Sequence, residues 1–253
     1  MGLIFQHAVF PVMLAVIAAA YAAVGQAGAT GYIAAMGIVG FTPDVIKPAA
    51  LALNTLAAAI GTARFGRAGH LTWRGTYPFI ILGLPFSVLG GATHLPASIY
   101  NPVVGVLLIV AAWRMAKSAR LAASIDERTP PHPPLLPSII AGVIIGFVAG
   151  VTGIGGGIFV APLVLTLHWL NTRHAAGLSA IFNFLNSAAA LAGLWSTSVI
   201  LPPELPSWLV AVAAGAILGS WLGVKHLPPG VLRYILSALL LVGGVWMLVD
   251  FTR

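Results

Sequence analysis

Uncharged hydrogen-bonding side chains occur inside the apolar segments of this sequence, where polar residues are expensive to place. They form two groups, Asn54 with Thr55 in one apolar run and Ser179, Asn183, Asn186 and Ser187 in another. Ser179, Asn183 and Ser187 follow one another at intervals of four and therefore share one face of a helix, which Asn186 borders. Amide and hydroxyl donors can hold the oxygens of an anion without a full charge. The alternative is that these groups join neighbouring helices, at about 0.6 kcal/mol per hydrogen bond.

Two glycine-rich turns, one in each half of the chain, form a second candidate site. Their candidate ligand-binding residues are Gly28, Thr30 and Gly31 in the first turn and Gly153, Gly155, Gly156 and Gly157 in the second. A glycine turn before a helix presents backbone N–H groups and a helix N-terminus with about half a positive charge. Glycines also permit close packing of helices. Three consecutive glycines, echoed in the other half, favour the anion-binding interpretation.

Several kinds of chemistry are absent from the sequence. No Asp or Glu lies within an expected membrane segment, whereas cation carriers and proton pumps usually keep a carboxylate there. The chain has no cysteine, and its seven histidines show no metal-ligand spacing. We therefore expect a carrier of a small anion, not an enzyme, with no cofactor and no metal. Lys47, Arg64 and Arg173 near segment ends either attract anions into a vestibule or anchor the helices at the interface.

The composition requires these residues to be positioned by membrane helices. The chain has 253 residues, of which 59% are hydrophobic and 7% charged, whereas a soluble domain carries about 25% charged residues. Its length allows about eight to ten membrane segments of roughly 20 residues each. The net charge of +7 comes from Lys and Arg between the apolar runs, which is typical of cytoplasmic loops and not of nucleic-acid binding. The predicted fold is an all-α, multi-pass integral membrane protein.

Apolar runs divide the chain into two halves of five segments. They cover 8–24, 31–41, 45–63, 75–92 and 99–116, then 136–151, 158–170, 175–195, 208–224 and 232–249. The second and seventh runs are too short to cross the bilayer upright, so they are expected to be half-membrane or re-entrant segments. The predicted organisation is a first repeat over 1–117, a cytoplasmic linker over 118–134 that is charged and then proline-rich, and a second repeat over 135–253.

The two halves resemble each other in sequence and are expected to be inverted. A shift of 125 residues superimposes Gly28 on Gly153 and Asn54 on Ser179. With an odd number of crossings per half, ten of the twelve basic residues fall on one face of the membrane, and only Lys47 and Arg253 fall on the other. The loop 196–207 corresponds to the basic loop around Arg64 yet carries no Lys or Arg, as the positive-inside rule predicts for inverted repeats.

The motifs resemble those of one known family. The run Gly150-Val-Thr-Gly153-Ile-Gly155-Gly156-Gly157, with Pro162, Ala176-Gly-Leu-Ser179 and Asn186-Ser187 downstream, is similar to the TauE/SafE family of bacterial membrane transporters. Ala52-Leu-Asn54 and Gly69-His-Leu-Thr-Trp73 extend the resemblance over nearly the whole chain. It implies movement of sulfite, organosulfonates or related sulfur oxyanions across the bacterial cytoplasmic membrane. The first glycine motif departs from the pattern, with Thr30 and Tyr32 in place of glycines, so Tyr32 is expected to stack on the site or narrow it.

Together these features predict a secondary transporter that exports a small anion by alternating access between inverted halves. The anion binds between the two glycine turns, and Asn54, Thr55, Ser179, Asn183 and Asn186 complete its shell. Two alternatives remain at this level: a channel-like anion pathway, and a membrane scaffold subunit that transports nothing. The expected partners are the anionic substrate, the lipid bilayer and, as a possible homodimer, a second copy of the chain.

Overall fold

The computed structural model describes residues 9–23, 25–121, 132–195, 201–223 and 229–250. These residues form helices and no strand, which confirms the all-α prediction. The helices are α2 (Phe10–Ala23), α3 (Ala29–Val39), α4 (Pro43–Arg67), α5 (Trp73–Ala92), α6 (Ala97–Leu121), α7 (Leu135–Thr152), α8 (Gly157–Thr166), α9 (Thr172–Trp195), α10 (Leu205–Gly223) and α11 (Pro229–Asp250). Each corresponds to one predicted apolar run, with ends that differ by a few residues.

Helix length separates membrane-crossing elements from shorter ones. Within the described ranges, five helices are long and apolar enough to cross a membrane, and they include most of α4, α5, α6, α7 and α9. The two predicted short segments are α3, with 11 residues, and α8, with 10. At 1.5 Å per residue each reaches about 16 Å, roughly half the hydrocarbon thickness. The chain is therefore a multi-pass membrane protein with two helices of half-membrane length.

The boundary between the predicted repeats lies between α6 and α7. Helix α6 continues to Leu121, so the first residues of the predicted linker are helical, and α7 begins at Leu135. Residues 122–131 of that linker lie outside the described residues.

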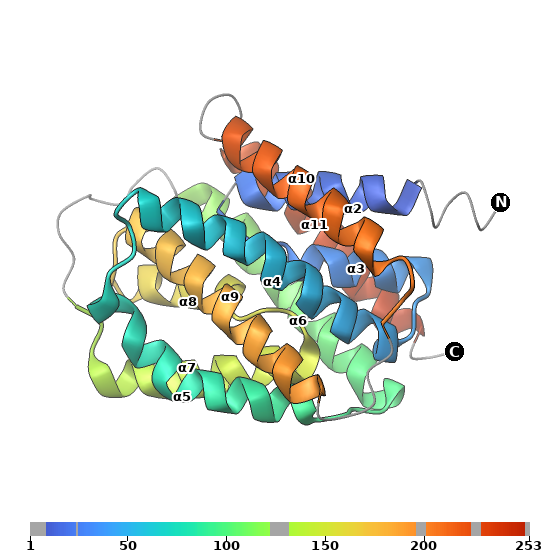
Figure 1. Ribbon diagram of the computed structural model, residues 1–253, viewed down its shortest axis with the longest axis horizontal. Coiled ribbons are helices and arrows are strands. Elements are labelled where there is room, and N and C mark those ends of the chain that lie inside the picture. The colour runs from blue at the N-terminus through green and yellow to red at the C-terminus, as the bar shows by residue number, and fades with distance from the viewer. Residues whose placement is uncertain (1–8, 24, 122–131, 196–200, 224–228, 251–253) are drawn as a thin grey trace.

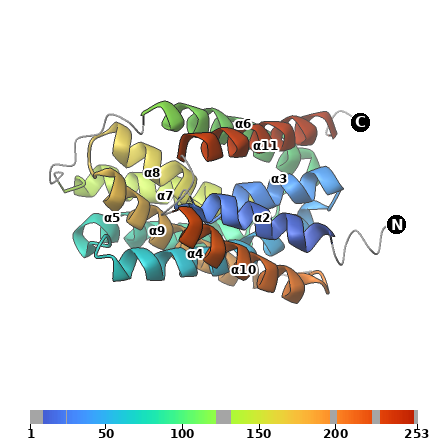
Figure 2. The ribbon, with the colours of Figure 1, turned by 90° about the horizontal axis from the view of Figure 1, so that it is seen from above.

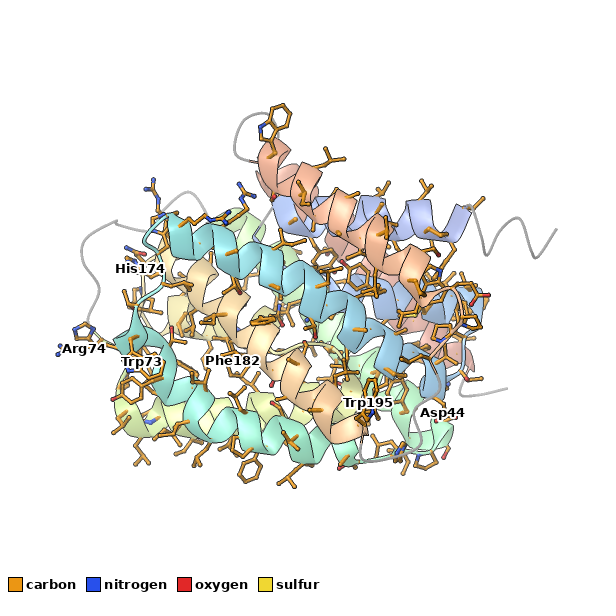
Figure 3. The ribbon with its side chains drawn as sticks, in the orientation of Figure 1. Asp44, Trp73, Arg74, His174, Phe182 and Trp195 are labelled. Carbon is orange, nitrogen blue, oxygen red and sulfur yellow. The ribbon has the colours of Figure 1, made fainter. Side chains whose placement is uncertain are left out.

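Long helices run through the molecule in opposite directions (Figure 1). Helix α4 begins with Asp44 at the end of the molecule where α9 finishes with Trp195, and α9 begins with His174 at the opposite end (Figure 3). The short helices α3 and α8 begin inside the molecule and run toward opposite ends (Figure 1). Arg74 lies at the same end as His174 (Figure 3), and we call this the basic end.

Helices of the first five pair with helices of the second five in a reciprocal pattern. Helix α5 packs along α7, α10 packs along α2, and α6 packs along α11 at one edge of the molecule (Figure 2). Glycines make the first two contacts close. A Cβ on Gly146 of α7 would lie 2.4 Å from the carbonyl oxygen of Gly83 on α5, and one on Gly219 of α10 would lie 2.0 Å from that of Ala19 on α2. Small residues allow such backbone approach where the bilayer supplies no hydrophobic driving force between helices.

Candidate functional site at the two helix breaks

Both short helices begin in the protein interior after a break in the helical backbone. Helix α2 ends at Ala23 and α3 begins at Ala29, while α7 ends at Thr152 and α8 begins at Gly157. The breaks contain Gly28 with φ +102° and Gly153 with φ +77°, a left-handed conformation that other residues adopt at a cost. First-turn N–H groups have no partner within their own helix. The breaks therefore place two sets of such donors in the interior.

Each short helix is capped by an asparagine from the long helix that follows it. The backbone N–H of Ala29, the first residue of α3, donates to Asn54 Oδ1 of α4 at 3.0 Å. The N–H of Gly157, the first residue of α8, donates to Asn183 Oδ1 of α9 at 2.9 Å. The local cap positions are Gly28 and Gly156, which have no side chain for this bond. The two halves thus solve the same capping problem with the same residue type.

The two capping asparagines meet at one glycine. A Cβ on Gly155 would lie 2.7 Å from Asn54 Nδ2 and 2.7 Å from Asn183 Oδ1. Gly155 has φ +76° and is buried, as are both asparagines, which are 0% and 4% exposed. The site therefore joins elements from both halves of the chain around a position where no side chain fits.

Two serines of α9 complete this arrangement. Asn54 Nδ2 donates to Ser187 Oγ at 2.8 Å, and Ser179 Oγ donates to the carbonyl oxygen of Gly157 at 2.9 Å. Both serines are buried. We call Asn54, Ser179, Asn183 and Ser187, together with Gly155 and Gly157, the asparagine cluster. Its amide, hydroxyl and backbone N–H groups form a set of uncharged donors in the protein interior.

Asn186 lies beside this cluster but bonds to a different helix. Its Oδ1 accepts a hydrogen bond from Ser87 Oγ on α5, while its buried Nδ2 has no partner in the described part of the chain. Ser87 is itself buried and also lies 2.8 Å from the carbonyl oxygen of Gly83. The sequence analysis did not select Ser87. Its only signal is that it is a lone hydroxyl in the middle of an otherwise apolar run.

Tyrosine hydroxyls fix the peptide groups at both breaks. Tyr32 OH donates to the carbonyl oxygen of Ala27 at 2.9 Å, and Tyr100 OH of α6 donates to that of Thr152 at 2.9 Å. Thr30 bonds to Tyr21 OH at 2.9 Å instead of facing the cluster. Tyr32 therefore holds the backbone of its own break, which corrects the expectation that it stacks on the site.

Other predicted site residues stand apart from the asparagine cluster. Thr55 bonds within α4 to the carbonyl oxygen of Leu51 at 2.7 Å. Gly31 lies inside α3, where a Cβ would meet Ile17 and Tyr21. Gly156 faces Phe182, with a would-be Cβ 2.2 Å from its ring. These glycines permit close packing, which is the alternative that their sequence context also allowed.

Lys47 has a structural partner at the end of α5. It is 6% exposed, and its Nζ donates to the carbonyl oxygens of Gly90 at 3.2 Å, Gly91 at 2.9 Å and Thr93 at 2.7 Å. A cation near the C-terminus of a helix binds carbonyls that have no partner in that helix. Lys47 therefore closes the end of α5, which corrects the expectation that it attracts anions or snorkels to the interface.

The structural equivalence of the halves differs from the best sequence match by one helical turn. The sequence shift of 125 residues pairs Asn54 with Ser179, whereas the capping bonds pair Asn54 with Asn183. The starts of α4 and α9, Pro43 and Thr172, differ by 172 − 43 = 129 residues. A shift of four residues keeps the same helix face, so both alignments place polar residues on the same side of α9.

A cavity of about 450 Å³ connects the basic end with the region of the asparagine cluster. It is lined by α2, α4, α9 and α10, and we call it the vestibule. Arg64, His70 and Arg173 line it, and Arg173 is exposed. Its lining also includes the buried Ala27 and Ala180, which are next to residues of the break and of the cluster. Positive charge therefore lies at the outer part of a cavity whose inner wall adjoins the cluster.

The described residues contain no group of three His, Cys, Asp or Glu side chains that could hold a metal ion. The chemistry available at the site is therefore hydrogen bonding from amides, hydroxyls and backbone N–H groups, together with two helix N-termini.

Comparison with known proteins gives a consistent result. The family described as "Sulfite exporter TauE/SafE" matches residues 9–247. The "Probable membrane transporter protein y4hK" of Sinorhizobium fredii is 51% identical over 233 residues, which cover 92% of this chain and 94% of that protein. The "Probable membrane transporter protein MJ0441" of Methanocaldococcus jannaschii is 29% identical over 221 residues, or 81% of this chain and 80% of that protein. No solved structure matches the chain with significance.

Proposed function

Because the chain belongs to the TauE/SafE family of membrane transporters, we propose that it is a secondary transporter of a small sulfur oxyanion. The substrate is sulfite, an organosulfonate or a related anion, exported across the bacterial cytoplasmic (inner) membrane. The observation that carries this proposal is the asparagine cluster, in which the N-termini of two half-membrane helices are capped beside one glycine.

The cluster supplies donors that an oxyanion can take over. In the described state Asn54 Oδ1 and Asn183 Oδ1 accept the N–H groups of Ala29 and Gly157. Anion oxygens would replace these two acceptors, and the asparagine Nδ2 groups would then turn toward the anion as additional donors. Two helix N-termini, each with about half a positive charge, favour this exchange. Neither step needs a charged side chain at membrane depth, where one would be costly.

Alternating access follows if the two halves are inverted repeats, with α3 and α8 as re-entrant helices. The opposite directions of α4 and α9 and the reciprocal pairing of α5 with α7 and of α10 with α2 support this arrangement. Inverted repeats in transporters move against each other around a site at their interface. Because the cluster contains residues of both halves, such a motion changes which side of the membrane it faces.

The vestibule provides the entry path from the basic end. Arg64 and Arg173 raise the local concentration of anions in a cavity with low-dielectric walls. If the basic end faces the cytoplasm, as the positive-inside rule implies, the vestibule collects the anion from the cytoplasm. This direction is the one required for export.

Transport by purified protein in liposomes tests the proposal. Vesicles loaded with labelled sulfite, thiosulfate, taurine, sulfate or a carboxylate analogue are assayed for protein-dependent efflux, and binding is measured separately by thermal stabilisation. We expect saturable efflux of at least one sulfur oxyanion, which is lost in the Asn54→Ala, Asn183→Ala double variant and kept in Thr55→Ala. Large single-channel currents would show a channel-like pathway instead. Neither binding nor flux of any anion would indicate a scaffold protein.

A further inference from the structure

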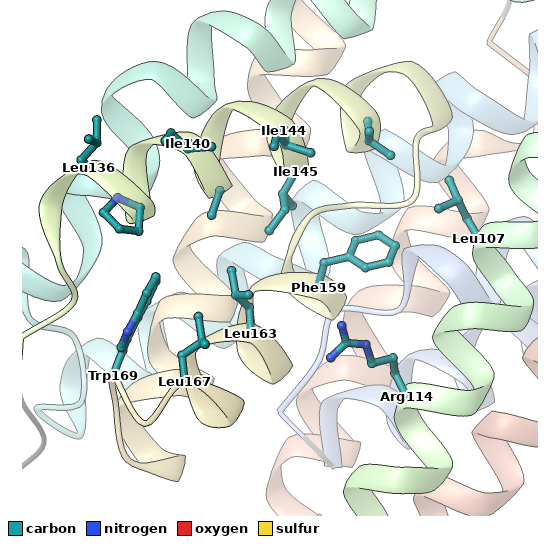
Figure 4. A pocket seen from close by; sticks show the side chains of 13 residues that line it. Leu107, Arg114, Leu136, Ile140, Ile144, Ile145, Phe159, Leu163, Leu167 and Trp169 are labelled. Carbon is teal, nitrogen blue, oxygen red and sulfur yellow. The ribbon is translucent and has the colours of Figure 1, made fainter.

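The two edges where a fifth helix of one half meets the short helix of the other half are packed differently. At one edge α11 lies directly on α3, so that a Cβ on Gly243 would meet Ala34 at 2.4 Å, and one on Gly37 would meet Met247 at 3.4 Å. At the other edge α6 makes only slight contact with α8. A groove of about 670 Å³ remains between α6, α7 and α8 (Figure 4).

The lining of this groove matches the dimensions of one bilayer leaflet. Leu136, Ile140, Ile144 and Val148 follow one another at intervals of four along one face of α7. They extend over twelve residues, or about 18 Å at 1.5 Å per residue, against about 15 Å for half of the hydrocarbon core. Leu136, Ile140 and Ile144 are each more than half exposed. The groove therefore opens on a surface that faces lipid chains.

The opposite wall of the groove comes from α8 and the residues after it. Phe159, Leu163 and Leu167 line it, and Trp169 lies beyond them (Figure 4). Because α8 begins in the interior and runs outward, this wall extends from membrane depth toward the basic end. Trp is enriched at the membrane–water interface, where its ring meets the headgroup region.

One cationic side chain lies in this apolar groove. Arg114 is the charged residue among those that line it, and it ends the apolar part of α6, Ala97–Arg114. Its guanidinium points from α6 toward Phe159 (Figure 4). It is partly buried and makes no hydrogen bond or ion pair with another residue in the described ranges. A cation at the edge of the hydrocarbon region is stabilised by an anion at the same depth.

We propose that this groove binds an anionic phospholipid from the leaflet at the basic end. The headgroup phosphate pairs with Arg114, and one acyl chain lies along the Ile140–Ile144 face of α7 against Phe159 and Leu163. A fork of five N–H donors on guanidinium suits a phosphate group. The proposal is independent of the transported anion, because the groove and the vestibule are lined by different residues.

Native mass spectrometry of the delipidated full chain, with phosphatidylglycerol or phosphatidylcholine added, tests this site. The wild-type protein is expected to retain phosphatidylglycerol in preference to phosphatidylcholine. Arg114→Gln should weaken phosphatidylglycerol binding about fivefold, as expected for the loss of one basic residue near an anionic lipid. Lys117→Gln is the matched control, because Lys117 is exposed, lies 5.2 Å from the Trp113 ring and is absent from the groove lining.

Two further variants separate charge from shape. Arg114→Lys should restore most of the preference, and Ile144→Trp should displace the lipid by filling the groove while Arg114 is intact. These two variants also decide the matter if Arg114→Gln fails to fold. Equal retention of both lipids, or unchanged phosphatidylglycerol binding in both Arg114→Gln and Ile144→Trp, would overturn the proposal. So would an Ile144→Trp protein that keeps its lipid and changes from dimer to monomer, because a second copy would then occupy the groove.

Discussion

Asn54 of α4 and Asn183 of α9 lie on either side of Gly155, and each accepts a hydrogen bond from the first residue of the short helix in its own half. The two asparagines are 129 residues apart in the sequence, counted as 183 − 54. A capping residue normally precedes its helix, whereas here it comes from the next helix along the chain. Each bond therefore fixes both the helix start and the position of a long helix relative to it.

We expect Asn54→Ala and Asn183→Ala each to lower stability by about 1–2 kcal/mol, the usual effect of losing a helix cap. Thermal unfolding in detergent gives this loss, and efflux assays should show a larger effect because the same groups would contact the anion. Thr55→Ala is the control, since its hydroxyl bonds only within α4. The double variant should depart from additivity by about 0.5 kcal/mol or more, because residues that share a neighbour are coupled. Strict additivity would contradict a shared site.

Gly155→Ala should inactivate the protein more severely than its backbone conformation alone explains. The new methyl group would lie 2.7 Å from atoms of both capping asparagines. Gly69→Ala is a matched control, because Gly69 has a similar φ of +74° but nothing within 4 Å of its would-be Cβ. The control should lose about 1–2 kcal/mol from left-handed strain and retain transport. Comparable efflux rates in the two variants would argue against a crowded site at Gly155.

Lys47 and Arg64 should separate structural from electrostatic roles of basic residues. Lys47→Met leaves three buried carbonyls without their donor and should lower stability by about 1–3 kcal/mol. Arg64→Gln should leave stability nearly unchanged but raise the KM for the anion and reduce its dependence on ionic strength. A KM change in Lys47→Met without destabilisation would contradict the role of Lys47 at the end of α5.

Helix-interior glycines should respond to alanine according to the space around them. Gly146→Ala would place a methyl group 2.4 Å from the carbonyl oxygen of Gly83 and should separate α5 from α7, with loss of thermal stability. Gly61→Ala meets only the Ala180 Cβ at 3.7 Å and should raise stability by up to about 1 kcal/mol through helix propensity. Stabilisation by both substitutions would show that close α5–α7 packing is not required.

The sequence predicted the helices well because hydropathy and length alone determine them. Both half-membrane helices, α3 and α8, were expected from runs too short to cross the bilayer, and their glycine breaks were expected from the Gly28 and Gly153 motifs. Asn54, Ser179 and Asn183 were selected because polar groups inside apolar runs are rare, and the structure brings them together.

The contacts between distant helices were less accessible from sequence. The partner of Lys47 is the end of α5, more than 40 residues away, and nothing local indicates it. The register of the repeat was displaced by one turn because α9 carries polar residues at four-residue intervals, so two alignments fit the same face. Which donor reaches which acceptor depends on where helices cross, and that depends on packing along their whole length.

The paired helix breaks also bear on what the transporter must keep out. Two N-termini, each with about half a positive charge, begin beside Gly155, and the described acidic residues Asp44 and Glu204 lie at helix ends away from it. A proton or sodium ion at this depth would meet repulsion from both helices and find no carboxylate to bind. Such an arrangement limits cation leak, so that opening the pathway to an anion would leave the ion gradients of the cell intact.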